Sequence, residues 1–294
     1  MRNHHISRRS FVLAGITLPA AAFALPKAAG SPPLTGDEII QRIKYNVGTP
    51  WLDHTVDRII AGNGGTPVHG IATTMMATLE VLQKAVAAGT NMVITHEPTF
   101  YSHEDATEEL RPDATFQHKA EFIRKNDLLV FRFHDHWHRR NPDGIALGMT
   151  RELGWEKNVD SQDPRLFSFP PTSLVEFVGT VKDRLKPHSM RVLGDPHMLV
   201  RKVFANWGYI SQIPGINLLA RPDIDVLIGG EAREWEVVEY AQDVISTGKK
   251  KALVLIGHVA SEQAGMAYSA QWLKPLFPEL PIEFVPASEP FWTA

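Results

Sequence analysis

The fold and the candidate site of this chain are decided by the stretch Ala252-Leu253-Val254-Leu255-Ile256-Gly257-His258-Val259-Ala260-Ser261-Glu262. Its first five residues are apolar and predict a buried strand, and a helix is expected to begin after the glycine. His258 and Glu262 are four residues apart, so they share one face of that helix. An imidazole and a carboxylate at a strand end offer two ligands to a divalent metal. The alternative is a surface pair in the first helical turn, because this spacing is a weak motif on its own.

The composition narrows the chemistry that the chain can perform. Its 294 residues are 44% hydrophobic and 21% charged, which is typical of soluble globular proteins. The length allows one large α/β domain or two smaller lobes. The sequence has no cysteine, so a metal site must use His, Asp and Glu, and 13 histidines are present. The net charge of −3 argues against a nucleic-acid partner. Neither a Gly-x-Ser-x-Gly elbow nor a glycine-rich nucleotide loop occurs.

Residues 1–29 have the pattern of an export signal. A basic start is followed by the apolar segment 11–25, which is too short to cross a bilayer comfortably, and by a small-residue cleavage motif at Ala22–Ala24. Ser7–Leu13 resembles the twin-arginine signal except in its last two residues. The alternatives are a general secretory signal with an incidental arginine pair, or an uncleaved anchor. We therefore expect a periplasmic or secreted protein whose mature form has no membrane segment.

The remaining chain, 30–294, is predicted to form one metal-binding α/β unit with two lobes and largely parallel sheets. A helix at 76–88 between strands at 68–73 and 91–95 forms a strand-helix-strand unit, which implies parallel pairing. We expect one lobe to contain 34–155 plus 250–294, and the other to contain 156–249. Thr35-Gly36-Asp37-Glu38 has the pattern of a capping box and predicts the start of a helix. The other expected elements are helices at 115–125 and 173–185 and strands at 128–133, 199–207, 225–230, 252–256 and 281–285.

Metal-ligating residue types follow four of these apolar strands. The strand exits are His96-Glu97, the run His134-Asp135-His136-Trp137-His138, Glu231, and His258. Ligands bind at the carboxyl ends of strands in open parallel sheets, so strands that share a sheet would bring these residues to one edge. Loops prefer Ser, Gly, Asn and Asp to repeated His. The pattern therefore predicts a His and carboxylate metal centre.

Spacing alone leaves the ligands within the run 134–138 open. If the strand continues, His134, His136 and His138 lie on one face and Asp135 lies on the other. A turn would direct only one or two of these side chains inward. A histidine that does not bind the metal could still orient a ligand.

Three motifs resemble the NGG-one-interacting-factor-three-like family of dinuclear-metal toroid proteins, also known as GTP cyclohydrolase I type 2 homologues. Gly257–Glu262 matches the family's Gly-His-x-x-Ser-Glu, Ile228–Glu231 resembles its Thr-Gly-Glu strand exit, and 77–98 resembles its helix and following His-His-Pro strand. The resemblance extends from about Leu34 to Phe291. It implies two-lobed subunits in a homohexamer, with two divalent ions between the lobes, and zinc, manganese, iron and nickel are all compatible.

The resemblance implies that His96, His258 and Glu262 are metal ligands. Glu97 replaces the family's second histidine, and His138 stands where the family has an aspartate. A histidine and a carboxylate have thus exchanged positions, so the number of ligands is preserved. We therefore favour His138 within its run, then His134, then Asp135. The family's common histidine after the Gly-Glu exit is replaced by Trp235. The expected ligand set is His96, Glu97, His134, His138, His258 and Glu262.

A pair of ions about 3.5–4 Å apart favours hydrolysis. We expect a metal-dependent hydrolase of a small anionic or amide-type molecule, with Glu97 or Glu231 as general base. Arg139 and Arg140 either neutralise an anion or form a solvated basic loop. The alternatives are a non-catalytic metal-binding or metal-delivery protein, or a toroidal scaffold.

Overall fold

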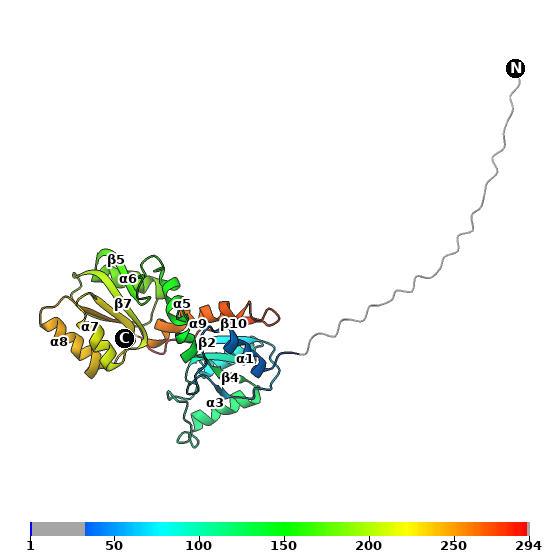
Figure 1. The fold of residues 1–294 in the computed structure, drawn as a ribbon. Coiled ribbons are helices and arrows are strands. Elements are labelled where there is room, and N and C mark those ends of the chain that lie inside the picture. The colour runs from blue at the N-terminus through cyan, green and yellow to red at the C-terminus, as the bar shows by residue number, and fades with distance from the viewer. Residues whose placement is uncertain (2–32, 293–294) are drawn as a thin grey trace. The chain divides into compact units, whose positions relative to one another are not determined.

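The computed structural model describes Met1 and residues 33–292. The predicted export signal lies outside the described residues, apart from Met1. Residues 33–292 form two five-stranded sheets, with strand orders β1-β4-β3-β2-β10 and β5-β7-β8-β9-β6 (Figure 1). This arrangement confirms the predicted α/β class with two sheets. No helix in the described part of the chain combines the length and apolar character needed to cross a membrane.

The first sheet is parallel except at one edge. Strands β2 (Ile71–Met76), β3 (Met92–Glu97) and β4 (Leu129–Arg132) run parallel, and β10 (Ile282–Phe284) pairs parallel to β2. Strand β1 (Ile59–Ala61) pairs antiparallel to β4. The connecting helices are α2 (Leu79–Ala87) between β2 and β3, and α3 (Ala114–Lys125) between β3 and β4. The predicted strand-helix-strand unit is therefore confirmed.

The second sheet has three parallel strands in its centre and an antiparallel strand at each edge. The parallel strands are β7 (Leu199–Tyr209), β8 (Val226–Glu231) and β9 (Ala252–Leu255). The edge strands are β5 (Leu166–Ser173) and β6 (Arg191–Leu193). The helices around this part of the chain are α6 (Leu174–Leu185), α7 (Gln212–Ala220), the π-helix η1 (Glu234–Val238) and α8 (Glu239–Ser246).

The sheets do not follow the predicted lobe bounds at 252–255, and the division into lobes stays a prediction. The prediction grouped 250–294 with the first lobe, but β9 pairs with β8 and β6 in the second sheet, and only β10 belongs to the first. The four strands that carry the candidate ligands therefore do not share one sheet, because β3 and β4 lie in the first and β8 and β9 in the second. A short apolar segment predicts that a strand is buried. Which strands it pairs with depends on the packing of the whole chain.

Helix α1 (Gly36–Asn46) begins at a capping box. The backbone N–H groups of Thr35 and Glu38 donate to each other's side chains, at 2.7 and 3.4 Å. The box satisfies two backbone donors that have no partner within the helix. Ile39 and Ile43 on its buried face join a core cluster that also contains residues of both sheets.

Helices α5 (Gly144–Leu153) and α9 (His258–Leu273) approach each other at a pair of glycines. A Cβ atom added at Gly148 would lie 2.5 Å from the Cα of Gly265 and 2.5 Å from the carbonyl oxygen of Ala264. Both obstacles are backbone atoms, so a side chain at this position would push the helices apart. This close approach fixes α9, which carries His258 and Glu262.

We expect Gly148→Ala to lower the free energy of unfolding by about 2 kcal/mol, because overpacking a closely packed contact costs about 1–3 kcal/mol. Gly179→Ala on α6 is the matched control, since nothing lies within 4 Å of its added Cβ. That change should raise stability by about 0.5–1 kcal/mol through the better helix propensity of alanine. Urea unfolding of the two variants measures both effects, and equal stabilities would contradict the proposed backbone clash.

Candidate metal centre

His96 and Glu97 are the last two residues of β3. The His96 side chain is fully buried, whereas 12% of the Glu97 side chain is exposed. Ligand atoms of His96, Glu97 and Glu262 all lie within 4.8 Å of one another. The strand end therefore presents an imidazole and a carboxylate to the same site, as the sequence predicted.

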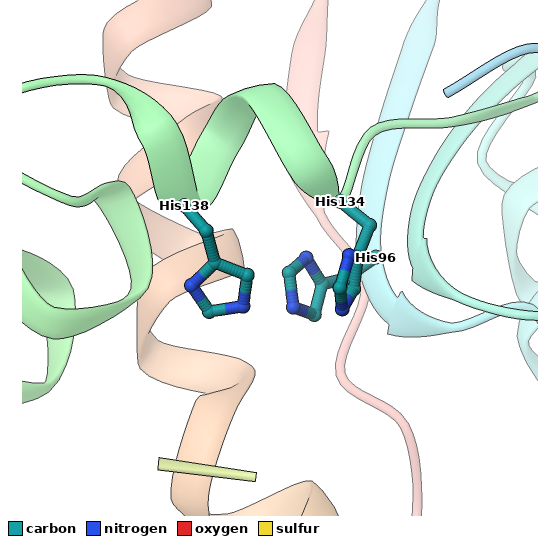
Figure 2. A group of neighbouring side chains, drawn as sticks. All are labelled: His96, His134 and His138. Carbon is teal, nitrogen blue, oxygen red and sulfur yellow. The ribbon is translucent and has the colours of Figure 1, made fainter. Parts of the chain in front are cut away.

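A short helix, α4 (Asp135–Arg139), determines which histidines of the run 134–138 reach the site. His134 and His138 are four residues apart and point to the same side, where His96 faces them (Figure 2). The rings of His134 and His138 lie 4.5 and 4.9 Å from that of His96, between centroids. His136 points elsewhere and stacks on Trp51, 3.6 Å away. The run is thus a helix, neither a continued strand nor a simple turn.

Asp57 holds the start of α4 in place. Its carboxylate accepts hydrogen bonds from the backbone N–H groups of His134, Asp135 and His136 at 2.6, 2.9 and 2.8 Å. It also lies 2.6 Å from Nδ1 of His136. The sequence did not indicate this role of Asp57, because it is 77 residues from His134 and no local pattern connects the two.

Helix α9 supplies His258 and Glu262, as predicted. Nε2 of His258 lies 3.2 Å from Glu262 Oε2 and 3.3 Å from Glu97 Oε1. Glu262 is 2% exposed and lies 3.7 Å from Nε2 of His96 and 3.9 Å from Nε2 of His138. Nε2 of His134 is 3.9 Å from Glu97. Two carboxylates therefore lie among four imidazole nitrogens, and all six predicted ligand residues come together.

The second sheet packs against the same carboxylate through Gly208 of β7. This glycine has φ of +71°, and an added Cβ would lie 2.4 Å from Glu262 Oε1. Its N–H donates to Ser261 Oγ at 3.1 Å. The close approach of this strand requires a residue without a side chain.

Each of the four histidines presents Nε2 to the cluster and bonds a second group through Nδ1. Such outer contacts fix the ring orientation and the tautomer of metal-binding histidines. The distances from Nδ1 are 3.3 Å for His96 to Phe133 O, 2.9 Å for His134 to Asp135, 3.0 Å for His138 to Asp143, and 3.0 Å for His258 to Glu231. Glu231 therefore contacts the predicted ligand His258, and its proposed role as a base stays a prediction.

Two buried atoms indicate that the residues fit a cation. Within residues 33–292, neither Nε2 of His96 nor Oε2 of Glu262 has a hydrogen-bond partner. Because Phe133 O can only accept, Nδ1 of His96 carries the proton and Nε2 holds a lone pair. Burial, with His134 and His138 nearby, places the pKa of His96 well below its ordinary value. A neutral imidazole thus faces a carboxylate across 3.7 Å, and a metal ion would satisfy both.

His258 and the carboxylates around it shift one another's pKa values strongly. Burial lowers the pKa of His258, but the carboxylates of Glu231, Glu262 and Glu97 outweigh it and raise that pKa to about 12. Burial raises the pKa of Glu97, but the contact with His258 outweighs it and lowers the pKa to about 2. A proton on His258 thus balances the carboxylates, and metal binding would release that proton.

A family model described as Duf34/NIF3 (NGG1p interacting factor 3) matches residues 50–290. The chain belongs to this family. A Chlamydia pneumoniae protein named GTP cyclohydrolase 1 type 2 homolog is 23% identical over 248 residues, which cover 81% of this chain and 92% of that protein.

Solved structures resemble this chain over nearly its whole length. A Bacillus cereus protein related to NIF3 has a TM-score of 0.71 at 16% identity, covering 90% of this chain and all of that one (100%). Reduced HcgD from Methanocaldococcus jannaschii has a TM-score of 0.64 at 18% identity, covering 86% of this chain and 98% of that one. At such low identity these similarities establish the fold alone.

Two cavities adjoin the candidate centre of this NIF3-family chain. Met76, Thr78 and His258 line both, and the cavities measure about 480 and 590 Å³. The smaller one also reaches Glu97. Neither Arg139 nor Arg140 is among the described residues that line them, and the Arg140 guanidinium lies 5.0 Å from the ring centroid of Trp137 instead. The prediction that these arginines neutralise a substrate anion gains no support.

Proposed function

We propose that this protein binds two divalent metal ions through His96, Glu97, His134, His138, His258 and Glu262 and uses them to hydrolyse a small molecule. The observation that carries the proposal is the buried Nε2 of His96, which has no hydrogen-bond partner among residues 33–292 and faces the Glu262 carboxylate across 3.7 Å. Nitrogen and carboxylate donors suit zinc, manganese, iron or nickel. Bound ions would supply Lewis-acid chemistry, lowering the pKa of water and polarising a substrate oxygen.

The protein's own residues would then position the substrate and move protons. Glu97 and His258 line the smaller cavity, so a molecule held there lies beside the metal-binding groups. Glu97 and Glu231 are the candidate general bases, and Glu231 lines the larger cavity with 52% of its side chain exposed. The adjoining cavities favour catalysis over a purely structural centre, because a structural site is usually closed.

The location and assembly of the protein form part of the same proposal. We propose export through a twin-arginine-type signal, a periplasmic or secreted mature protein, and a homohexamer. An exported protein meets little GTP, so we favour another small substrate over the one suggested by the name of the Chlamydia pneumoniae relative.

Elemental mass spectrometry of the purified protein tests the metal centre. We expect about two metal equivalents per chain, and fewer in His96→Ala and His258→Ala, because each variant removes a proposed ligand. His118→Ala is a control on the exposed face of α3 and should keep the parent's metal content. A parent without bound metal would contradict the proposal.

If metal is present, a screen of small esters, amides and phosphate esters tests hydrolysis. Turnover that is lost in the His96→Ala and His258→Ala variants supports the enzyme. Full metal occupancy with no turnover of any compound would favour the metal-binding or metal-delivery alternative, or the scaffold.

A further inference from the structure

Lys119 is a buried cation beside the candidate centre. It lies on α3, is 4% exposed, and lines the cavity of about 480 Å³ together with Glu97 and His258. Its Nζ donates to the carbonyl oxygen of Thr99 at 2.5 Å. The same helix carries Arg124 and Lys125, which are exposed, so the burial of Lys119 is specific to this position.

The Lys119 ammonium keeps unused hydrogen-bonding capacity. An ammonium has three N–H donors, and Thr99 O is its one hydrogen-bond acceptor among the described residues. Asp105 is the nearby carboxylate, but it already accepts hydrogen bonds from the backbone N–H groups of Thr99 and Phe100 at 2.7 Å each. Its other oxygen lies 3.6 Å from Arg132. The lysine charge is therefore only partly balanced by the protein.

The surroundings make this charge costly to retain without a ligand. Burial lowers the pKa of Lys119 to about 8, which reflects the loss of hydration around the ammonium. The rings of Phe100 and Tyr101, with centroids 5.7 and 5.3 Å from the ammonium, attract it only weakly and do not replace the lost hydration. An apolar side chain at position 119 would avoid the cost of burying a charge. An anion bound in the cavity would balance the ammonium and would account for a lysine at this position.

The loop that forms the wall of the cavity is held in place. Asp105 fixes Thr99 and Phe100 as described, and the buried Arg132 donates to the carbonyl oxygen of His103. Ser102 and His103 on this loop line the same cavity and add polar groups. Because this loop is already ordered, a ligand that binds beside it loses less free energy in fixing the loop.

We propose that Lys119 binds an anionic oxygen group of the substrate, either a carboxylate or a phosphoryl group, in the cavity next to Glu97 and His258. This assignment rests on the proposed function and specifies its substrate class. It places the anion site on Lys119 of α3, away from Arg139 and Arg140.

Isothermal titration of the metal-loaded protein with glutarate, phenyl phosphate and neutral glutaramide tests the assignment. The first two compounds distinguish a carboxylate from a phosphoryl site, and glutaramide lacks the charge. We expect Lys119→Met to weaken binding of the preferred anion at least ~10-fold, since hydrogen bonds to charged groups contribute most to affinity. Lys125→Met is the matched control on the same helix, with 66% of its side chain exposed, and should bind like the parent.

A pH series provides a second measurement that does not depend on the folding of Lys119→Met. The ammonium loses its proton as the pH rises past about 8, so anion affinity should fall there, and Lys119→Arg should retain affinity because arginine stays charged. Asp105, Glu97, His103 and His258 also face this region, and they are unchanged in both proteins.

Metal content measured on the same samples separates the two proposals. Metal-loaded parent that binds no anion, or that binds it equally in Lys119→Met, overturns the role of Lys119 and leaves the metal centre standing. Anion binding that depends on Lys119 in a parent without metal would support the anion site and contradict the proposed hydrolase.

Discussion

Alanine in place of Glu262 is expected to remove most of the bound metal and to make the protein less stable. The Glu262 carboxylate lies 3.2 to 3.9 Å from Nε2 of His258, His96 and His138, so a single change removes the group shared by three imidazoles. Loss of a group that only orients a ligand weakens metal binding about 10–100-fold, and loss of the ligand itself should exceed that range. Metal present at 100 times its dissociation constant stabilises a protein by about 2.7 kcal/mol, which the variant would lose.

Elemental mass spectrometry and urea unfolding with and without a chelator measure the effect of Glu262→Ala. The stability difference between parent and variant should narrow when the chelator is present, because both proteins then lack metal. Glu279→Ala is the control, since its side chain is 46% exposed and pairs with Arg42. A Glu262→Ala protein that keeps the parent's metal content would remove Glu262 from the ligand set.

Methionine in place of Arg132 is expected to lower the free energy of unfolding by about 3–5 kcal/mol, the usual cost of breaking a buried ion pair. The Arg132 side chain is fully buried, and its guanidinium lies 3.5 Å from Glu97 and 3.6 Å from Asp105. It also donates to the carbonyl oxygen of His96 at 3.2 Å. Removing the cation would take one shared partner from Glu97 and Asp105 and would loosen the strand end that carries His96 and Glu97.

Urea unfolding checks the Arg132→Met prediction, and metal content should fall in the same variant because Glu97 loses a contact. Arg124→Met is the control, since that side chain is 72% exposed and pairs with Glu121 on the surface. Surface pairs contribute about 0–1 kcal/mol, so the control should change little. Similar decreases in the free energy of unfolding of Arg132→Met and Arg124→Met would contradict the prediction, because the buried guanidinium would then contribute no more than the exposed one.

The parts of the fold predicted correctly are those that the local sequence specifies. The capping box at Thr35 and Glu38 needs only four consecutive residues, and it is present. Helices at 114–125, 174–185 and 258–273 and the strand 282–284 follow from apolar spacing within each segment. The six candidate ligand residues were chosen by combining spacing with a family resemblance; they lie close together, and their role as ligands stays a prediction.

The parts that were missed depend on residues far apart in the chain or on weak local patterns. Strand β5 contains Pro170 and Pro171, which cannot donate backbone hydrogen bonds. Because proline is uncommon in strands, the sequence of this segment did not indicate a strand. The placement of β9 in the second sheet depends on its neighbours β8 and β6. Asp143 bonds His138 from the start of α5, and nothing near Asp143 marks it as a partner of a ligand. Local sequence does not specify such contacts.

The dependence of α4 on Asp57 has a consequence for the order in which the protein matures. A helix of five residues is not stable by itself, since forming the first helical turn is costly. His134 and His138 therefore acquire their common direction only after Asp57 has reached the backbone of 134–136 across 77 residues of chain. In the unfolded chain, these two histidines are not held where both could bind one ion. Under the proposed function, metal would then bind after folding, and the compartment in which the chain folds would determine which metal ions are available to it.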